Sequence, residues 1–418
     1  MADIGASSNF DASLKTLYPF KKVQLHAYRT CPLFARLNKR TDFAGQNLEI
    51  FNWFGTPQGV SSVFATAQAN ATAGSYAAFA LTTAKKYGVL AWQGEVLDAA
   101  ASDVGAHLPA IKAGVDGTIA SVSNALCSDL YGNGGGALGQ VGSISATDLT
   151  LKNIEDVVHF EEGMELESSE TDGTSGSVQS GTATITAINR DTGVLTTDSN
   201  WTSQIAALDA DDYLFRQDDF GVVVSGVRAW VPDSAPSATA FFGVDRTTDA
   251  TRLGGIRYDA SSSGENHGTY EEALQGAGSR LEREGGIGNG PIVVFMNPKD
   301  RSILSRSLGS KARYAKYEFA IGGKRSKAKV GFNPLVIDDF NQPIEVMSDP
   351  RAPQGRALML TMNTWVFASR GPAPKILQKD RNKFLRETND DSYELRVGYY
   401  GNLGCHAPGW NVNITLPT

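Results

Sequence analysis

The sequence predicts an α+β fold, and three observations support this. Apolar residues recur in steps of three and four from Val104 to Leu130, which predicts one long amphipathic helix. Thr182–Ile188 alternates between apolar and polar residues as a strand does, and a turn at 189–193 leads back through 194–196. Short apolar runs that suit strands dominate the C-terminal part of the chain. Separate helical and strand segments in one chain are typical of α+β proteins.

The most unusual segment, Ile50–Ala84, is thirty-five residues long and contains no Asp, Glu, Lys or Arg. Twenty of the thirty residues Gly55–Ala84 are Gly, Ala, Ser or Thr, so the segment buries too little apolar surface to fold alone. It also lacks the charge that keeps a disordered linker solvated. We therefore expect an arm that lies on a neighbouring copy of the chain. Its start, Ile50–Phe54, is expected to pair with the strand-like end, Phe79–Trp92, as a long hairpin.

The other N-terminal elements follow in order. A short helix is expected at Asp11–Leu17, and Pro32–Phe34 is an apolar anchor. Pro109 is expected to kink the long helix or to lie in the first turn of a second segment, and glycines end the helix after Tyr131. A short helix is expected at Thr147–Phe160.

The remaining chain alternates between helical and strand patterns. Helices are expected at Thr269–Glu284 and Lys299–Leu308. The expected strands are Val222–Val231, Pro291–Met296, Leu335–Ile337, Pro343–Met347, Ala357–Thr361, Trp365–Ala368, Tyr393–Tyr400 and Trp410–Leu416.

Charge is distributed unevenly, although the net charge is only −7. Asp148–Asp219 contains sixteen acidic and three basic residues, whereas Lys299–Lys329 contains ten basic and two acidic residues. These blocks are either charge-complementary faces of neighbouring subunits or two solvated faces. Aromatic residues lie among the basic ones, as in some nucleic-acid binders, but the glycines there favour a loop that pairs between subunits. The loop residues expected at such contacts are Lys311, Arg313, Lys324 and Arg325.

No catalytic or metal-binding pattern stands out. Gly134–Gly139 matches GxGxxG, but a dinucleotide site needs a strand before it and a helix after it, and here a helix precedes and a loop is expected to follow. The acidic group Asp209, Asp211 and Asp212 lacks the glycine and glutamate of a calcium loop. The three cysteines lie far apart and are expected to be free thiols. We therefore expect no enzyme activity, no cofactor and no metal.

The termini and the apolar runs suggest a soluble protein. The N-terminus lacks the basic and apolar regions of a secretion signal. The longest largely apolar run, Ala357–Ala368, is too short to span a bilayer. We expect a cytoplasmic protein with no membrane partner.

Ten short stretches carry a resemblance to a known family: Phe64–Asn70, Tyr87–Val89, Glu95–Asp98, Phe241–Arg246, Leu253–Arg257, Thr269–Leu274, Val294–Pro298, Tyr399–Cys405, Ala407–Pro408 and Ile414–Pro417. Their order along nearly the whole chain resembles that of the major capsid proteins of tailed bacteriophages, which share the Hong Kong 97 capsid fold. This resemblance implies an N-terminal arm, an extended loop, a peripheral domain with a long spine helix, and an axial domain. The acidic β-rich unit resembles the small insertion domains that some members carry.

The resemblance also implies a division of the chain. The expected parts are an N-terminal arm (1–49), an extended loop (50–92), the spine helix of the peripheral domain (93–146), an insertion domain (147–220), a second peripheral part (221–285), an axial domain (286–370) and closing peripheral strands (371–418).

The implied function is that of a structural protein of the virion. Its subunits assemble into pentamers and hexamers of an icosahedral shell around double-stranded DNA, in the host bacterial cytoplasm, with scaffolding and portal proteins as partners. An encapsulin-like compartment with enzyme cargo shares the fold and stays an alternative, although such relatives are usually shorter and lack an insertion. A third alternative is an unrelated enzyme whose site is assembled from distant residues.

The extended loop is expected to supply contacts between subunits. The residues expected there are Phe64, Gln68, Asn70, Tyr76, Lys85 and Lys86. Some relatives crosslink a loop lysine to an asparagine of a neighbour, but no partner asparagine is matched in this sequence, so crosslinking is not expected from it.

Overall fold

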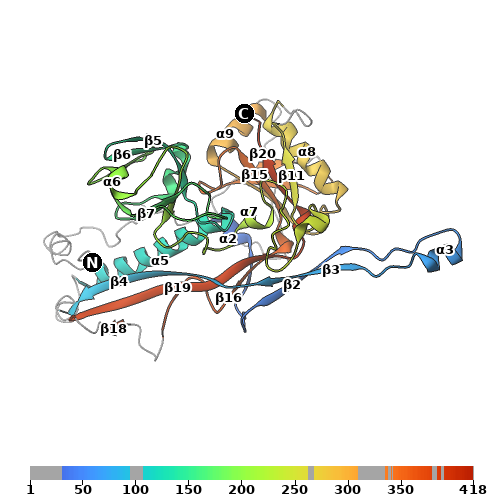
Figure 1. Ribbon diagram of the computed structural model, residues 1–418, viewed down its shortest axis with the longest axis horizontal. Helices are drawn as coiled ribbons and strands as arrows, with labels where there is room; N and C mark the ends of the chain where they lie inside the picture. Colours follow the sequence, from blue (N-terminus) through green and yellow to red (C-terminus); the bar gives the residue numbers. More distant parts are fainter. Residues whose placement is uncertain are drawn as a thin grey trace, which may run out of the picture.

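The computed structural model describes residues 31–94, 107–261, 268–308, 335–337, 340, 342–378, 384–386 and 390–417. Within these ranges the chain forms a long sheet with a helix running along it, a second sheet flanked by helices, a small barrel, and an arm that projects from the body (Figure 1). The expected α+β class is confirmed. The helix expected at Asp11–Leu17 lies outside the described residues.

The long sheet combines strands from both ends of the chain. Its strands are β1 (Asn38–Arg40), β4 (Ala84–Gln93), β16 (Trp365–Ser369), β17 (Lys375–Ile376), β18 (Phe384–Arg386) and β19 (Ser392–Cys405). β4 pairs antiparallel with β19 along its whole length. Helix α5 (His107–Tyr131) runs along this pair (Figure 1). The helix approaches β4 closely because Gly88 has no side chain: a Cβ there would lie 2.7 Å from Val122 Cγ2.

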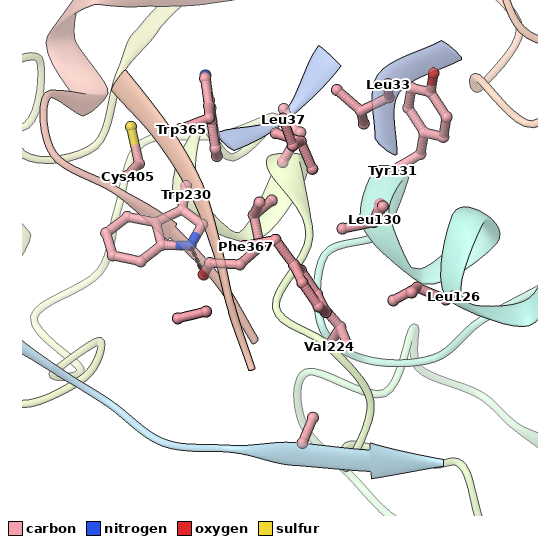
Figure 2. Packing of buried hydrophobic residues seen from close by; sticks show 14 of the residues in the cluster. Leu33, Leu37, Leu126, Leu130, Tyr131, Val224, Trp230, Trp365, Phe367 and Cys405 are labelled. Carbon is pink, nitrogen blue, oxygen red and sulfur yellow. Dashed lines mark hydrogen bonds between the residues drawn. The ribbon is translucent and has the colours of Figure 1, made fainter. Parts of the chain in front are cut away.

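Helix α5 agrees with its sequence pattern. It has Pro109 in its first turn and ends at Tyr131, as the second-segment alternative predicted. Its C-terminal half is buried together with α2 (Pro32–Arg36), which confirms the apolar anchor (Figure 2). In the same core, the Trp230 indole donates a hydrogen bond of 2.8 Å to the Leu403 carbonyl.

The second sheet has the strand order β11-β20-β15-β12-β14-β13. These strands are β11 (Ile256–Asp259), β12 (Ile292–Met296), β13 (Leu335–Ile337), β14 (Ile344–Ser348), β15 (Arg356–Thr361) and β20 (Asn411–Thr415). Helices α8 (Tyr270–Arg283) and α9 (Pro298–Leu308) pack on it. The Thr269 hydroxyl caps α8 by accepting a hydrogen bond from the Glu272 amide at 3.3 Å. The helices and strands expected in this region are confirmed.

The acidic, β-rich part of the chain is a closed barrel with the order β10-β5-β6-β9-β8-β7. Its strands are β5 (Gly139–Ser145), β6 (Asp148–Leu151), β7 (Glu165–Ser169), β8 (Ala183–Asn189), β9 (Val194–Thr197) and β10 (Tyr213–Arg216). The hairpin expected at 182–196 is confirmed as β8 and β9. The barrel has its own core, in which Leu149 and Trp201 are fully buried.

Two expectations at the barrel were wrong. Thr147–Phe160 is not a helix but the strand β6 followed by a 3-10 turn, η1 (Ile154–His159), because Leu149 and Leu151 alternate into the barrel core. The loop expected after Gly134–Gly139 is likewise a strand, β5, so the barrel begins before the boundary expected at residue 147.

The third error concerns Val222–Val231, which was expected to be a strand. Its end is a short helix, α7 (Val227–Trp230), next to Gly226. A Cβ at Gly226 would lie 2.3 Å from the Asp129 carbonyl oxygen, so this backbone lies directly on the end of α5. Since Val227, Ala229 and Trp230 are all buried, the apolar run reflects burial alone and not strand formation.

In the described part of the chain, three further 3-10 turns connect elements: η2 (Arg246–Asp249), η4 (Met362–Thr364) and η5 (Pro408–Trp410). Of the helices in the described part of the chain, none has the length and apolar character needed to cross a membrane.

The barrel should be removable as a unit, because its two ends meet. The Leu138 amide donates to the Leu214 carbonyl at 2.8 Å, and Leu214 pairs with Gly139. We expect that joining Ala137 directly to Gln217 leaves a soluble subunit with a cooperative thermal unfolding transition. The matched control deletes only Lys152–Arg216, which leaves β5 and β6 without their barrel partners and should aggregate. Aggregation of both variants would show that the body needs the barrel to fold.

Candidate assembly surface

A two-stranded arm extends from the body of the subunit. β2 (Leu48–Gly55) pairs antiparallel with β3 (Ser75–Leu81), and a short helix, α3 (Phe64–Ala69), lies near the tip (Figure 1). The expected hairpin is therefore confirmed. The expected second strand, Phe79–Trp92, is divided at Thr82 and Thr83: β3 continues the arm, whereas β4 joins the long sheet.

The root of the arm is anchored in the core. Ile50, Phe79 and Leu81 are buried, and the Ala80 amide donates to the Phe242 carbonyl at 2.9 Å. On the other strand, the Arg252 guanidinium donates to the Phe54 carbonyl at 2.6 Å. These contacts hold the base of the hairpin in one orientation, so the distal part is presented as an extension of the body.

Because the arm is anchored here, we expect position 404 of β19 to have no room for a side chain larger than that of Gly404. A Cβ at this position would lie 2.2 Å from Ile50 Cδ1, inside the packed root. We expect Gly404→Ala to destabilise the subunit by about 1–3 kcal/mol, the usual range for overpacking a core. The measurement is the midpoint of urea unfolding of the isolated subunit.

The control for this substitution is Gly117→Ala on α5. No heavy atom lies within 4 Å of a Cβ at Gly117, and replacing a helical glycine by alanine should stabilise by about 0.5–1 kcal/mol. Equal unfolding midpoints for the two variants would contradict the tight packing of the arm root.

The distal arm is not buried by any described part of the subunit. From Trp53 to Ala78 no residue is buried, and large apolar side chains are exposed, among them Phe64 at 81%, Tyr76 at 63% and Trp53 at 61%. The Trp53 and Tyr76 rings stack on each other with centroids 5.6 Å apart. An isolated hairpin is marginal in water, and clustered exposed apolar residues mark interaction sites. The arm is therefore the candidate assembly surface.

The structure places the expected contact residues in three groups. Phe64, Gln68, Asn70 and Tyr76 are all exposed along the arm. Lys85 is exposed as well, but it lies on β4 in the body. The charged loop residues Lys311, Arg313, Lys324 and Arg325 lie outside the described residues.

Lys86 was expected at an intersubunit contact, and the structure places it inside the subunit. Its ammonium group lies 2.7 Å from Asp129 Oδ2 and 2.9 Å from Asp219 Oδ2, and only 10% of its side chain is exposed. Burial by itself lowers the pKa of Lys86, but the two carboxylates outweigh it and raise that pKa. Burial raises the pKa of the Asp129 carboxyl, and Lys86 partly offsets this. Lys86 therefore ties β4 to α5 and to the segment that follows the barrel.

Sequence reasoning did not find the two partners of Lys86. Asp129 lies among the apolar positions of α5, and Asp219 is one of many acidic residues near the barrel. The signal that the sequence offered was Asp129, an acidic residue next to the apolar stripe of the long helix. Within the described ranges, no three His, Cys, Asp or Glu side chains are grouped so as to hold a metal ion.

Comparisons with known proteins rest on structure alone, because the sequence matches no protein-family model and no curated protein. The chain is similar to a protein of the cyanophage A-1(L) capsid asymmetric unit, with a TM-score of 0.55, 11% identity, and 97% of both chains covered. It is also similar to a capsid protein of the empty GTA particle, with a TM-score of 0.49, 7% identity, and 100% and 99% of the chains covered. A third likeness is to the SrpI encapsulin of Synechococcus elongatus, with a TM-score of 0.43, 10% identity, and 97% and 94% covered. The first of these likenesses shows that the chain has the Hong Kong 97-type capsid fold that the resemblance implied.

Proposed function

We propose that the protein is the major capsid protein of a tailed bacteriophage, a structural subunit that assembles into pentamers and hexamers of an icosahedral shell around double-stranded DNA. The observation that carries the proposal is the arm: a hairpin that is uncharged beyond Glu49 and has exposed aromatic residues, held at its root and uncovered beyond it, on a chain with a capsid fold.

Packing on another surface would stabilise the arm, because an isolated hairpin is marginal in water. Burying Phe64, Trp53 and Tyr76 against a neighbour removes apolar area from water, at about 25 cal/mol per Å². The distal arm, from Trp53 to Ala78, contains no Asp, Glu, Lys or Arg, so this burial requires no desolvation of ions. The free energy of each contact is modest. In a closed symmetric shell, however, every subunit both gives and receives an arm, so the free energies of the contacts add up.

The long helix and β4–β19 form a stiff beam, and the acidic barrel and basic residues supply charge complementarity that sets register between subunits. Scaffolding and portal proteins are proposed as partners and the host bacterial cytoplasm as the place of assembly, with the mature product in the virion.

The proposed function is tested by the size of the assemblies that the purified chain forms. We expect capsomers or closed particles in analytical ultracentrifugation and in negative-stain electron microscopy. A monomer under all conditions of salt, concentration and crowding agent would contradict the proposal. Double-stranded DNA in particles from the natural source would support a phage capsid, whereas particles filled with a folded enzyme would identify an encapsulin-like compartment instead.

A further inference from the structure

A groove runs along the free edge of β4, the strand that follows the arm. β4 pairs at ten positions with β19 and, among the described residues, with no other strand. Beside β4 lies a cavity of about 520 Å³, which is within the range of ligand-binding pockets. Four consecutive residues of β4, Lys86–Val89, line it, whereas no described residue of β19 does. Since neighbouring side chains of a strand point to opposite faces, such a run places the cavity beside the edge of β4 that faces away from β19.

Helix α5, which runs along β4 (Figure 1), forms the second wall of the groove with mostly small side chains. The residues of this wall recur at helical spacing on one face of α5: Gly114, Gly117, Thr118, Ser121, Val122 and Ala125. A Cβ at Gly117 would have no heavy atom within 4 Å, so the wall leaves open space there. Glycine allows another backbone to approach closely. An extended peptide therefore has room between α5 and the edge of β4.

The third wall is formed by the end of the barrel and carries an arginine without a partner. Arg216 and Gln217 line the groove together with Asp219, whose carboxylate lies 2.9 Å from the ammonium group of Lys86. The Arg216 side chain makes no hydrogen bond or ion pair with any described residue, and its Nε is buried without an acceptor. Buried polar atoms in proteins nearly always have a hydrogen-bond partner. The groove therefore offers a cationic donor for which no described residue supplies the acceptor.

We propose that this groove binds an extended segment of another protein, which adds a strand to the free edge of β4 and places an aspartate or glutamate side chain against Arg216. The backbone amides and carbonyls that β4 directs away from β19 pair with the segment, as exposed strand edges do with peptide ligands. The carboxylate accepts charge-assisted hydrogen bonds from the Arg216 guanidinium. The strand edge thus selects an extended backbone, and Arg216 selects an acidic side chain.

The arm of a second copy of this chain does not meet both requirements. From Trp53 to Ala78 the arm contains no Asp or Glu that could pair with Arg216. The groove is therefore a binding site separate from the candidate assembly surface, and the proposal does not rest on the proposed function.

The test uses a library of random nine-residue peptides, selected by display on the folded full chain. Peptides that also bind Gly117→Leu, in which leucine fills the groove, are removed. We expect the remaining peptides to share an Asp or Glu. A synthetic copy should bind the unsubstituted chain in fluorescence anisotropy and bind Arg216→Gln about tenfold or more weakly, because hydrogen bonds to a charged group are lost.

The matched control for the filled groove is Gly268→Leu. A Cβ at Gly268 also has no heavy atom within 4 Å, but Gly268 does not line the groove. We expect this variant to bind the peptide as the unsubstituted chain does. Thermal unfolding of both leucine variants should match that of the unsubstituted chain, which separates a blocked groove from a folding defect.

Strand addition is tested on the peptide backbone. Successive amides of a strand point to opposite edges, so N-methyl groups on alternate residues block one edge of the peptide at a time. We expect one set of N-methyl groups to abolish binding and the other set to be tolerated. The proposal is wrong if no peptide remains after the removal step, if the selected peptides lack a carboxylate or bind Arg216→Gln equally well, or if both N-methylated sets bind alike.

Discussion

Replacing Phe64 with aspartate should leave the subunit folded and abolish its assembly into particles. Phe64 is 81% exposed in the isolated subunit, so the substitution removes no packing within the chain. It is also the first residue of α3, where a negative charge is favourable to a helix. In an assembled shell the new carboxylate would be buried against a neighbour without a partner.

The expected size of this effect follows from the cost of burying a charge. An unpaired charge at an interface costs about 3 kcal/mol or more, which raises the concentration needed for assembly by more than about a hundredfold. Circular dichroism and thermal unfolding should match the unsubstituted subunit, while sedimentation and electron microscopy should show no particles.

The matched control is Val178→Asp, which places the same charge on an exposed apolar position of the barrel. Val178 is 43% exposed and lies far from the arm in sequence. We expect this variant to assemble. Normal particles from Phe64→Asp would show that the tip of the arm stays in solvent, and the candidate assembly surface would then be wrong.

The second large effect is expected at Lys86. Replacing it with methionine keeps most of the side-chain volume but leaves Asp129 and Asp219 without their shared cation. Only 4% and 18% of these two side chains are exposed, and breaking a buried ion pair by removing one partner costs about 3–5 kcal/mol. The measurement is urea unfolding of the isolated subunit, with the slope checked for two-state behaviour.

The adjacent lysine provides the control. Lys85→Met removes the same charge from an exposed position of the same strand and should change stability by less than about 0.5 kcal/mol. Adding Asp129→Asn to Lys86→Met should restore part of the loss, because it removes one of the two unpaired charges. Equal stability of the two lysine variants would contradict the buried position of Lys86.

Much of the fold followed from local sequence patterns. The long helix, β12, α8 and α9 were predicted because apolar periodicity and caps act over a few residues. The barrel hairpin β8–β9 was predicted from alternation around a turn. The segments that were mispredicted, Thr147–Phe160 and Val222–Val231, are short apolar runs whose conformation depends on what covers them.

The candidate assembly surface was also predictable only in part. The uncharged composition of Ile50–Ala84 predicted an arm. The structure buries only the root of this segment in the core and leaves the rest outside it. The roles of the two adjacent lysines were not predictable. Neighbours on a strand face opposite sides, and only the position of α5 over β4 decides that Lys86 is covered and Lys85 is exposed.

The sequence by itself therefore determined the α+β class, the long helix, α8, α9, the principal strands and the exposed arm, because these depend on composition and on patterns that repeat within a few residues. Only the tertiary structure decided that Lys86 binds Asp129 and Asp219. The physical reason is that such contacts join residues far apart in the chain, and they form only when the packing of whole elements brings those residues together.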